Sequence, residues 1–415
     1  MNILFVHQNY PGQYRESVPR LAATGEHKIV FLTQRKDSPK PADHTVGIYK
    51  SAHEPKEDAW VFSKWFETTV GNGVGCAQAC NSLKRQGFKP DIITGHASWG
   101  ELIYTKDVWP DVPLVGYFEY YFIPKGGLVG YDPEFPEKAD IAPRLHTNNA
   151  ANYLTYVRCE GVLTASKWQK SVFPTMLQDK MEVCHEGIRT ERLTPDHDSN
   201  LSVTLGKTVF RRGQELVTYI ARNLEPARGF HTMMRALPRL QALRPNAHVA
   251  IIGSDGISYG AKLPEGQTFR GRLTKELGDT VDWSRVHFLG RVPYSQLINL
   301  LKISNCHVYL TAPFVVSWSM MESMALEKTI VATDVDSVKE VLEDGKTAFL
   351  INYFKPLDLA ERVADVLSHP DNYLSIGQAA RRKVVADYDF LAKWFPQFIG
   401  HLNAHLPSDK QIRVP

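Results

Sequence analysis

Residues 311–334 read TAPFVVSWSMMESMALEKTIVATD and contain the clearest fold signal in the chain. An apolar run that ends at Leu310 predicts a strand, and residues 329–333 predict a second strand. Between them, a turn that contains Pro313 leads into a helix. This succession of strand, loop, helix and strand is the building unit of parallel α/β sheets.

The start of this helix suits a phosphate or a diphosphate, because backbone N–H groups and the positive end of the helix dipole point outward there. Ser317, Ser319 and Glu322 lie in the predicted first turn. Ser319 and Glu322 also match the S-x-x-E capping box, in which each side chain satisfies a backbone donor of the other. Spacing alone favours the capping box, and both interpretations stay open at this point.

The same stretch resembles the donor-site segment of GT-B glycosyltransferases of the retaining family 4, in which a glutamate, seven residues and a second glutamate precede Ala-Met-Ala. Glu322, followed by Ser-Met-Ala, matches the second glutamate. The resemblance extends over nearly the whole chain. It implies that Glu322 binds the ribose of a nucleotide-sugar and that the backbone around Ser317, Trp318 and Ser319 holds the diphosphate.

The chain departs from the family pattern at Phe314, which replaces the first glutamate. A phenyl ring accepts no hydrogen bond from a sugar hydroxyl. Phe314 either lines the site with Trp318, which favours a less polar face of the sugar, or lies in the core. The replacement affects the sugar contact more than the phosphate contact, since backbone donors do not depend on that side chain.

Composition narrows the class of protein. The 415 residues are 43% hydrophobic and 22% charged, and this length predicts two domains. The net charge is +3, and lysine and arginine are interspersed with acids, which argues against a nucleic-acid partner. Five cysteines fit a reducing compartment. Without a signal-peptide pattern or a membrane-spanning apolar run, we expect a cytoplasmic protein, either free or peripherally associated with the inner face of a membrane.

The first half begins with a buried strand at residues 3–6 and a loop that contains Gly12 and Gln13. The loop lacks the G-x-G-x-x-G dinucleotide fingerprint. In the family the corresponding loop is glycine-rich and faces the cleft between the domains, so Gly12 and Gln13 become donor-site candidates. A tight turn that needs one glycine explains the sequence equally well. Further along, glycines at residues 71–75 predict a break in a helical segment.

His96 and Glu119 each follow an apolar run that predicts a parallel strand, and ligands of such sheets bind beyond the carboxyl ends of the strands. Family members often have a reaction-centre histidine after the second of these strands, where Glu119 is the nearest match. We therefore expect Glu119, and after it His96, to act in catalysis, with a structural histidine as the alternative. The aromatic residues 117–121 suit stacking on an acceptor sugar, and the turn-rich residues 126–136 suit an acceptor-side loop.

In the second half, Arg222 and Arg228 border a turn that follows a predicted strand. The family has an arginine and a lysine here, both directed at the donor diphosphate; Arg222 matches the arginine and Arg228 replaces the lysine. Arginine keeps the charge and adds a two-pronged donor. Taken alone, two such arginines suit solvated or capping charges. Arg291 and Val292 match the place where relatives hold the nucleobase through main-chain groups.

We therefore predict an α/β protein of GT-B fold, with two Rossmann-like domains facing each other across a cleft. The predicted parts are residues 1–189, a linker at 190–212, residues 213–387 that bind the nucleotide-sugar, and a C-terminal helix at 388–415 that returns to the first domain. The expected activity is transfer of a sugar, with retention, from a UDP-sugar or a GDP-sugar to a glycan, lipid-linked or protein acceptor. Two alternatives are a sugar-nucleotide epimerase that uses Glu119 and a non-catalytic binding protein. Without Asp-x-Asp or a clustered His/Asp set, we expect no metal and no cofactor.

Overall fold

The structure is a computed structural model that describes residues 1–136, 141–196, 200–260 and 263–413. The chain divides into two compact units, and we describe each by itself. The first unit comprises Met1–Lys125, Glu137–Gly187 and Phe390–Pro415; the second comprises Gly126–Pro136 and Ile188–Asp389.

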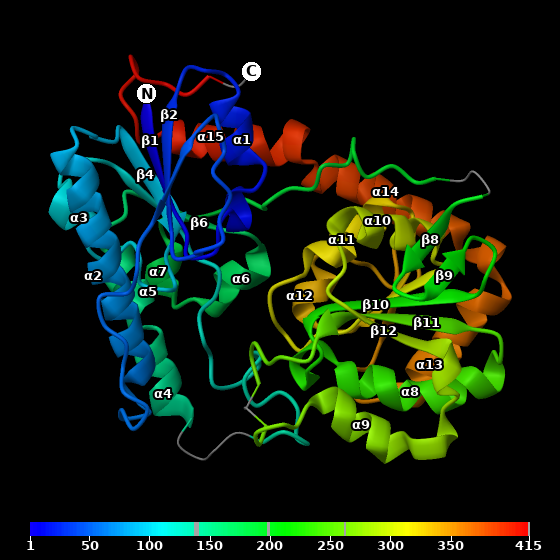
Figure 1. Cartoon of the computed structure of the whole chain (residues 1–415). Helices are drawn as coiled ribbons and strands as arrows, with labels where there is room; N and C mark the ends of the chain where they lie inside the picture. Colours follow the sequence, from blue (N-terminus) through cyan, green and yellow to red (C-terminus); the bar gives the residue numbers. More distant parts are fainter. Residues whose placement is uncertain (137–140, 197–199, 261–262, 414–415) are drawn as a thin grey trace. The chain divides into compact units, whose positions relative to one another are not determined.

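The described part of the first unit folds around a sheet of seven strands, all of which pair in parallel. The strand order is β3-β2-β1-β4-β5-β6-β7; β1, β2, β4 and β6 are labelled in Figure 1. This order reverses between β1 and β4, and ligands of open parallel sheets bind beyond the carboxyl ends at such a reversal. The strands are β1 (Asn2–Val6), β2 (Lys28–Thr33), β3 (Thr45–Ile48), β4 (Ile92–His96), β5 (Leu114–Tyr117), β6 (Gly161–Thr164) and β7 (Met181–Val183).

Both faces of this sheet are buried, which is why its strands are apolar runs rather than alternating sequences. Ile3 and Phe5 pack in one hydrophobic cluster with Phe398, whereas Leu4 and Val6 pack in another. The described helices of this unit are α1 (Ser17–Ala22), α2 (Lys64–Arg85), α3 (Thr105–Val108), α4 (Ile141–Asn148), α5 (Ala150–Tyr156), α6 (Lys167–Val172), α7 (Thr175–Gln178), the π-helical turn η6 (Phe390–Trp394) and α15 (Phe395–Asn403).

Helix α2 is continuous, so the predicted break at residues 71–75 is wrong. Its glycines serve a close approach of the backbone instead. A Cβ atom on Gly71 would lie 2.2 Å from the carbonyl oxygen of His53, and one on Gly75 would lie 2.0 Å from that of Lys50. The glycines therefore let residues 50–53 cross the helix at backbone distance, which offsets their low helix propensity.

The described part of the second unit contains six parallel strands in the order β12-β11-β10-β13-β14-β15. Its order reverses between β10 and β13, as the first sheet's order does between β1 and β4. The strands are β10 (Leu216–Asn223), β11 (His248–Ser254), β12 (Val286–Gly290), β13 (Cys306–Tyr309), β14 (Thr329–Thr333) and β15 (Phe349–Ile351).

Helices again pack on both faces of the second sheet (Figure 1). Phe230 and Leu237 of α8 pack with Val217 in one cluster, and Met321 of α11 packs with Tyr309 in another. The longer described helices of this unit are α8 (Phe230–Leu243), α9 (Phe269–Leu277), α10 (Tyr294–Ile303), α11 (Trp318–Ala325), α13 (Pro356–Ser368) and α14 (Leu374–Tyr388), and a short α12 (Asp336–Lys339) follows β14.

Two segments differ from the predicted division of the chain. Within the predicted linker at 190–212, β8 (Ser202–Leu205) and β9 (Thr208–Arg211) form an antiparallel hairpin that packs on the second unit through Val203 and Phe210. Gly126–Pro136, predicted as an acceptor-side loop of the first domain, packs with the second unit. Its Glu134 carboxylate pairs with Arg235 of α8, at 2.6 and 2.8 Å. Both segments therefore belong to the second unit.

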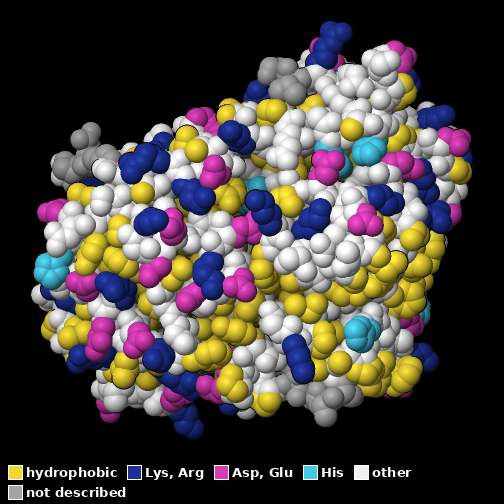
Figure 2. Space-filling model, turned by 180° about the vertical axis from the view of Figure 1, so that it is seen from behind, with side chains coloured by type: hydrophobic (Ala, Val, Ile, Leu, Met, Phe, Trp, Pro, Cys, Tyr) yellow, Lys and Arg dark blue, Asp and Glu magenta, His cyan; other side chains and the backbone are white. Residues whose placement is uncertain are grey.

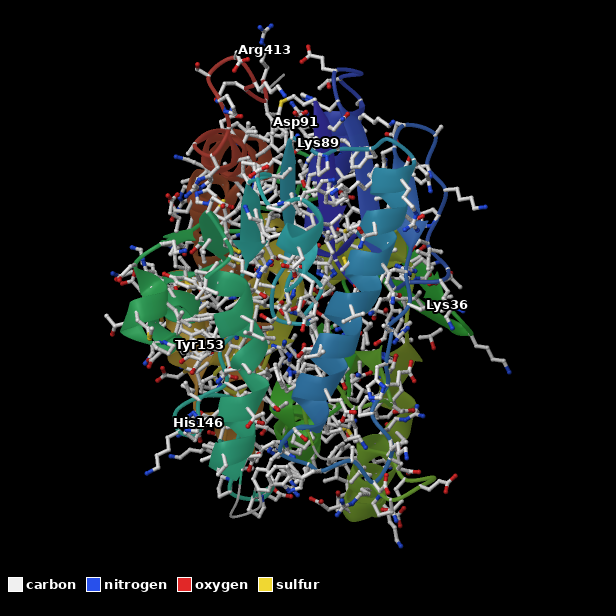
Figure 3. All side chains as sticks on the ribbon, turned by 90° about the vertical axis from the view of Figure 1, so that its left-hand side faces the viewer. Lys36, Lys89, Asp91, His146, Tyr153 and Arg413 are labelled. Atoms are coloured by element: carbon white, nitrogen blue, oxygen red, sulfur yellow. The ribbon has the colours of Figure 1, made fainter. Side chains whose placement is uncertain are left out.

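The last residues of the chain complete the core of the first unit. Phe395, Phe398 and Leu402 of α15 lie in the same hydrophobic cluster as β1. Lys410 forms an ion pair with Asp91 at 2.7 Å, and Asp91 also accepts the backbone N–H of Asn2. Figure 3 labels Lys89 and Asp91, which precede β4, on the amino side of the sheet.

Candidate active site

The first unit gathers polar side chains beyond the carboxyl ends of β1, β4 and β5. His7 Nε2 donates to Gln13 Oε1 at 2.6 Å, and Gln13 Nε2 donates to Glu119 Oε1 at 3.2 Å. His96 Nε2 donates to the other carboxylate oxygen of Glu119 at 3.3 Å. The structure therefore brings Gln13, His96 and Glu119 together, and it adds His7, which the sequence reasoning did not single out.

Gly12 begins the 3-10 turn η1 (Gly12–Tyr14) with a φ of +52°, in the left-handed region. A Cβ atom at this position would lie 2.6 Å from the His7 ring. The glycine thus allows the loop to approach His7 closely enough for Gln13 to reach it. His7 Nδ1 accepts the backbone N–H of Asn9 at 2.9 Å, which fixes the Nε2–H tautomer that donates to Gln13.

Burial sets the electrostatics of this network. His96 is buried, and its Nδ1 has no hydrogen-bond partner in the described part of the chain. Glu101 is fully buried near it, and Glu101 Oε1 accepts the backbone N–H of Gln8 at 3.0 Å. Burial raises the pKa of Glu101 to about 7, against the opposing charge of His96. The burial of Glu101 could not be predicted from the sequence, because a single glutamate in a turn has no pattern that indicates burial.

The aromatic residues 117–121 do not present their faces to a ligand, contrary to the prediction. Tyr117, Tyr120 and Tyr121 are all buried. The Tyr117 hydroxyl donates to Glu186 at 2.6 Å, and the hydroxyls of Tyr121 and Tyr153 are 2.9 Å apart. These rings support the end of β5 instead of stacking on an acceptor.

In the second unit, Arg228 is held at the end of a 3-10 turn, η2 (Pro226–Arg228), after β10. Its guanidinium is anchored through Nη1. This atom donates to Thr311 Oγ1 at 3.0 Å, to the Val315 carbonyl at 3.2 Å and to the Tyr309 hydroxyl at 3.5 Å. One edge of the guanidinium is thereby fixed to the segment that links β13 to α11.

Two adjacent aromatic rings pack against one side of the same guanidinium. The Arg228 Cζ atom lies 5.4 Å from the ring centroid of Tyr259 and 5.2 Å from that of Phe314. The two ring centroids are 4.7 Å apart. Phe314 is only 6% exposed, so of the two interpretations of this residue the structure selects burial. It takes the place of a carboxylate and packs against a cation.

Arg222 does not share these contacts. It is an exposed residue near the end of β10, and its side chain makes no hydrogen bond or ion pair to the described residues. The sequence suggested two equivalent arginines, whereas the structure distinguishes a fixed, half-buried Arg228 from a solvated Arg222.

Helix α11 begins two residues earlier than a capping box of Ser319 and Glu322 would require. Ser317 is its N-cap, and Ser317 Oγ accepts the backbone N–H of Ser319 at 3.3 Å. Glu322 therefore lies beyond the first turn, and the predicted pairing of Ser319 with Glu322 as a capping box is not formed. Glu322 is only 2% exposed and accepts a hydrogen bond from the Tyr294 hydroxyl at 2.8 Å. Trp318 is the first residue of the helix.

The remaining candidates lie after β12. Arg291 is exposed, and its Nε donates to Ser254 Oγ at 2.7 Å, which links the ends of β12 and β11. Val292 is half-buried and packs beside the cluster that contains Ile252. Tyr294, two residues further, is 51% exposed although its hydroxyl reaches Glu322. Sequence reasoning missed Tyr294 and Tyr259, because each acts through a partner distant in the chain.

Two properties of the described residues concern metal ions and membranes. No group of three or more His, Cys, Asp and Glu side chains there is arranged to hold a metal ion. None of the helices in that part of the chain has the length and apolar character needed to cross a membrane. On the face drawn in Figure 2, lysine and arginine side chains are mixed with aspartate and glutamate side chains.

Family models match the two halves of the chain separately. Residues 25–193 match the model described as "Glycosyl transferase family 4 group". Residues 206–383 match the model described as "Glycosyl transferases group 1". The second match contains Arg222, Arg228, Arg291 and Glu322.

Curated relatives are distant. A phosphatidyl-myo-inositol mannosyltransferase of Mycolicibacterium smegmatis is 26% identical over 178 residues, which are 41% of this chain and 40% of that protein. The chain therefore spans well under half of that relative. A glycogen synthase of Mycobacterium tuberculosis is 19% identical over 422 residues, with 94% of this chain and 92% of that protein covered.

Solved structures match over almost the full length. Sucrose-phosphate synthase from Thermosynechococcus elongatus has a TM-score of 0.69 at 14% identity, with 97% of this chain and 98% of that chain covered. Anabaena HepE in complex with UDP-glucose has a TM-score of 0.68 at 15% identity, with 97% and 100% covered. These likenesses concern the fold, which is two Rossmann-like units with parallel sheets.

Proposed function

We propose that this chain, which is a glycosyltransferase with the GT-B fold, moves a sugar from a nucleotide-sugar to a hydroxyl group of an acceptor with retention of the anomeric configuration. The observation that carries the proposal is Arg228, fixed by one edge beside the segment that leads into α11. Structures of HepE with UDP and with UDP-glucose favour a UDP-sugar as the donor, with a GDP-sugar as the second choice.

Charge compensation at the leaving group is the role we assign to the second unit. As the bond to the sugar breaks, negative charge grows on the departing diphosphate. Arg228 uses Nη1 to hold its position, so its other nitrogens can donate to the phosphate oxygens. The start of α11, around Ser317 to Ser319, adds the positive end of the helix dipole. The Ser319 N–H already donates to Ser317 Oγ and the Ser317 N–H to the Tyr309 hydroxyl, so a diphosphate would have to compete with these bonds. This arrangement supplies the compensation without a metal ion or a cofactor.

Glu322 is the group that we assign to the donor ribose. Its carboxylate is buried and already accepts the hydroxyl of Tyr294. A ribose hydroxyl offers the same O–H donor, so it can replace that phenol if the exposed Tyr294 moves aside. Arg291 and Val292 then lie in the segment assigned to the nucleobase, and Arg222 and Trp318 border the donor site.

The first unit is the side to which we assign the acceptor. Glu119 accepts from Gln13 and from His96, so both of its carboxylate oxygens are oriented before a substrate arrives. An oriented carboxylate can accept a hydrogen bond from an acceptor hydroxyl. We assign Glu119 this role, with His96 as its support and Gly12 as the residue that lets the loop close. A glycan, a lipid-linked acceptor and a protein acceptor all offer such a hydroxyl.

The proposal is tested first by donor screening. We expect UDP-sugars, among UDP-, GDP-, ADP- and dTDP-sugars, to raise the melting temperature and to be hydrolysed slowly without an acceptor. NMR of the anomeric proton of the transfer product should then show the donor's configuration, and an inverted product would contradict the retaining assignment. Interconversion of two nucleotide-sugars without an acceptor would indicate an epimerase.

Arg228→Ala tests the role of this arginine in charge compensation. We expect kcat to fall by about 10²–10³, equivalent to about 3–4 kcal/mol, because one preorganised charge donor is lost. Arg362→Ala is the matched control, since Arg362 of α13 also lies over a ring, that of Phe349 at 4.3 Å, and pairs with Asp365. Unchanged kcat/KM in Arg228→Ala would refute the role of this arginine in charge compensation.

A further inference from the structure

Glu225 is a fully buried carboxylate that the proposed chemistry does not use. It lies between β10 and η2, and its side chain accepts three consecutive backbone N–H groups of the loop after β11. Ser258 N donates to Oε1 at 3.0 Å, and Tyr259 N and Gly260 N both donate to Oε2 at 3.0 Å. Asn223 Nδ2 also donates to Ser258 Oγ at 2.6 Å.

Three successive N–H groups that converge on one point form an anion-binding nest, of the kind that holds phosphates in other proteins. Here the protein supplies the anion itself, because the Glu225 carboxylate fills the nest formed by residues 258–260. The loop is therefore closed to a substrate phosphate at these amides. It is instead a rigid platform, and what it presents is the side chain of Tyr259.

Tyr259 connects this platform to Arg228. Its ring lies 5.4 Å from the Arg228 Cζ atom and packs against Phe314. Glu225 also acts on Arg228 through the backbone, since its carbonyl accepts the Arg228 N–H at 3.1 Å. One residue thus determines the start of the turn that carries Arg228 and the place of the ring that flanks its guanidinium.

We propose that Glu225 is a positioning residue for Arg228, and that it acts through the loop at residues 258–260 and the ring of Tyr259. The inference rests on the proposed function only in its consequence for sugar transfer. The structural part of the inference does not depend on that function. The Glu225 carboxylate fixes the loop at residues 258–260, and Tyr259 of this loop packs against Arg228. Packing against two adjacent rings and bonding along one edge restrict the orientation of this cation, and no acidic side chain among the described residues pairs with it to compete with a diphosphate.

Hydrogen exchange tests whether Glu225 fixes the loop at residues 258–260. Glu225→Gln keeps the shape but replaces one accepting oxygen by an NH₂ group, which faces N–H donors. We expect the amides of residues 258–260 to exchange at least tenfold faster in this variant, measured by mass spectrometry on peptides that cover residues 255–260. Glu215→Gln is the matched control, because it removes a half-buried carboxylate of the same unit that pairs with Arg244. Equal exchange in Glu225→Gln and wild type would overturn the inference.

A double-mutant cycle tests the positioning role. We expect Glu225→Gln to lower kcat/KM at least tenfold, and the double variant with Arg228→Ala to lie within twofold of Arg228→Ala alone, since Glu225 acts through that arginine. Multiplicative effects of the two changes would overturn the role. If the wild-type protein neither binds UDP nor transfers a sugar, the proposed function fails, whereas the exchange comparison still decides whether Glu225 holds the loop.

Discussion

The buried carboxyl group of Glu101 makes the stability of the first unit depend on pH. It is fully buried, and burial raises its pKa from 4.5 to about 7. The folded protein therefore keeps a proton on this group that the unfolded chain releases near pH 4.5. Folding stability from this group is complete below the unfolded pKa and is lost as the pH rises toward 7, after which it stays constant.

Glu101→Gln removes this titration and keeps the buried side chain neutral. We expect the variant to unfold with nearly the wild-type free energy near pH 5 and to exceed the wild type at pH 8 by up to about 3 kcal/mol, the equivalent of the shift in pKa. Urea unfolding at the two pH values measures the difference. A constant difference between the variant and the wild type across this range would contradict a raised pKa.

At the scale of elements, the Tyr294 hydroxyl of α10 donates a hydrogen bond to Glu322 of α11 at 2.8 Å. If a ribose hydroxyl must replace the Tyr294 hydroxyl, Tyr294→Phe removes a competitor. We expect this variant to bind UDP about tenfold more tightly by calorimetry, because a hydrogen bond to a charged group is worth about 1.5 kcal/mol.

Tyr373→Phe is the control, since it removes a similar bond, from Tyr373 to Asp365 at 2.7 Å, in the same unit. Glu322→Gln should weaken UDP binding while the melting temperature stays unchanged. Weaker binding by Tyr294→Phe would show that the phenol supports the nucleotide instead of competing with it.

A second prediction at this scale concerns the close backbone approach at helix α2. Gly75→Ala places a Cβ atom 2.0 Å from the Lys50 carbonyl oxygen, so either the helix or the crossing chain must move. We expect a loss of about 1–3 kcal/mol in unfolding free energy, the usual cost of overpacking. Gly400→Ala in α15 is the matched control, since nothing lies within 4 Å of its Cβ position. That change should stabilise the protein by about 0.5–1 kcal/mol. Equal melting temperatures for the two variants would contradict the close approach.

For the whole molecule, the C-terminal segment belongs to the core of the first unit. Removal of residues 390–415 takes away Phe395, Phe398 and Leu402 and uncovers one face of the sheet. We expect a chain that ends at residue 389 to aggregate on expression, since a large exposed apolar face associates with others. A chain that ends at residue 413 should behave as the full chain does. Soluble, monomeric protein from the shorter chain would contradict this account.

Local patterns were sufficient for the architecture. Apolar runs such as residues 3–6 and 329–333 predicted buried parallel strands, because strand and helix periodicities are properties of neighbouring residues. The same reasoning, with the family resemblance, named Gln13, His96 and Glu119, which the folded chain joins in one hydrogen-bond network. The family resemblance also named Arg228 and Glu322.

The tertiary structure decided what each candidate contacts. Phe314 is a buried partner of Arg228, Ser317 and not Ser319 caps α11, and the Glu225 carboxylate accepts hydrogen bonds from a loop more than thirty residues away. Pattern reasoning had no access to these pairings, since a hydrogen bond or a ring contact depends on distances between residues that are remote in the chain. Periodicity acts within a few residues, whereas burial, pKa shifts and side-chain pairing arise only when the chain has packed.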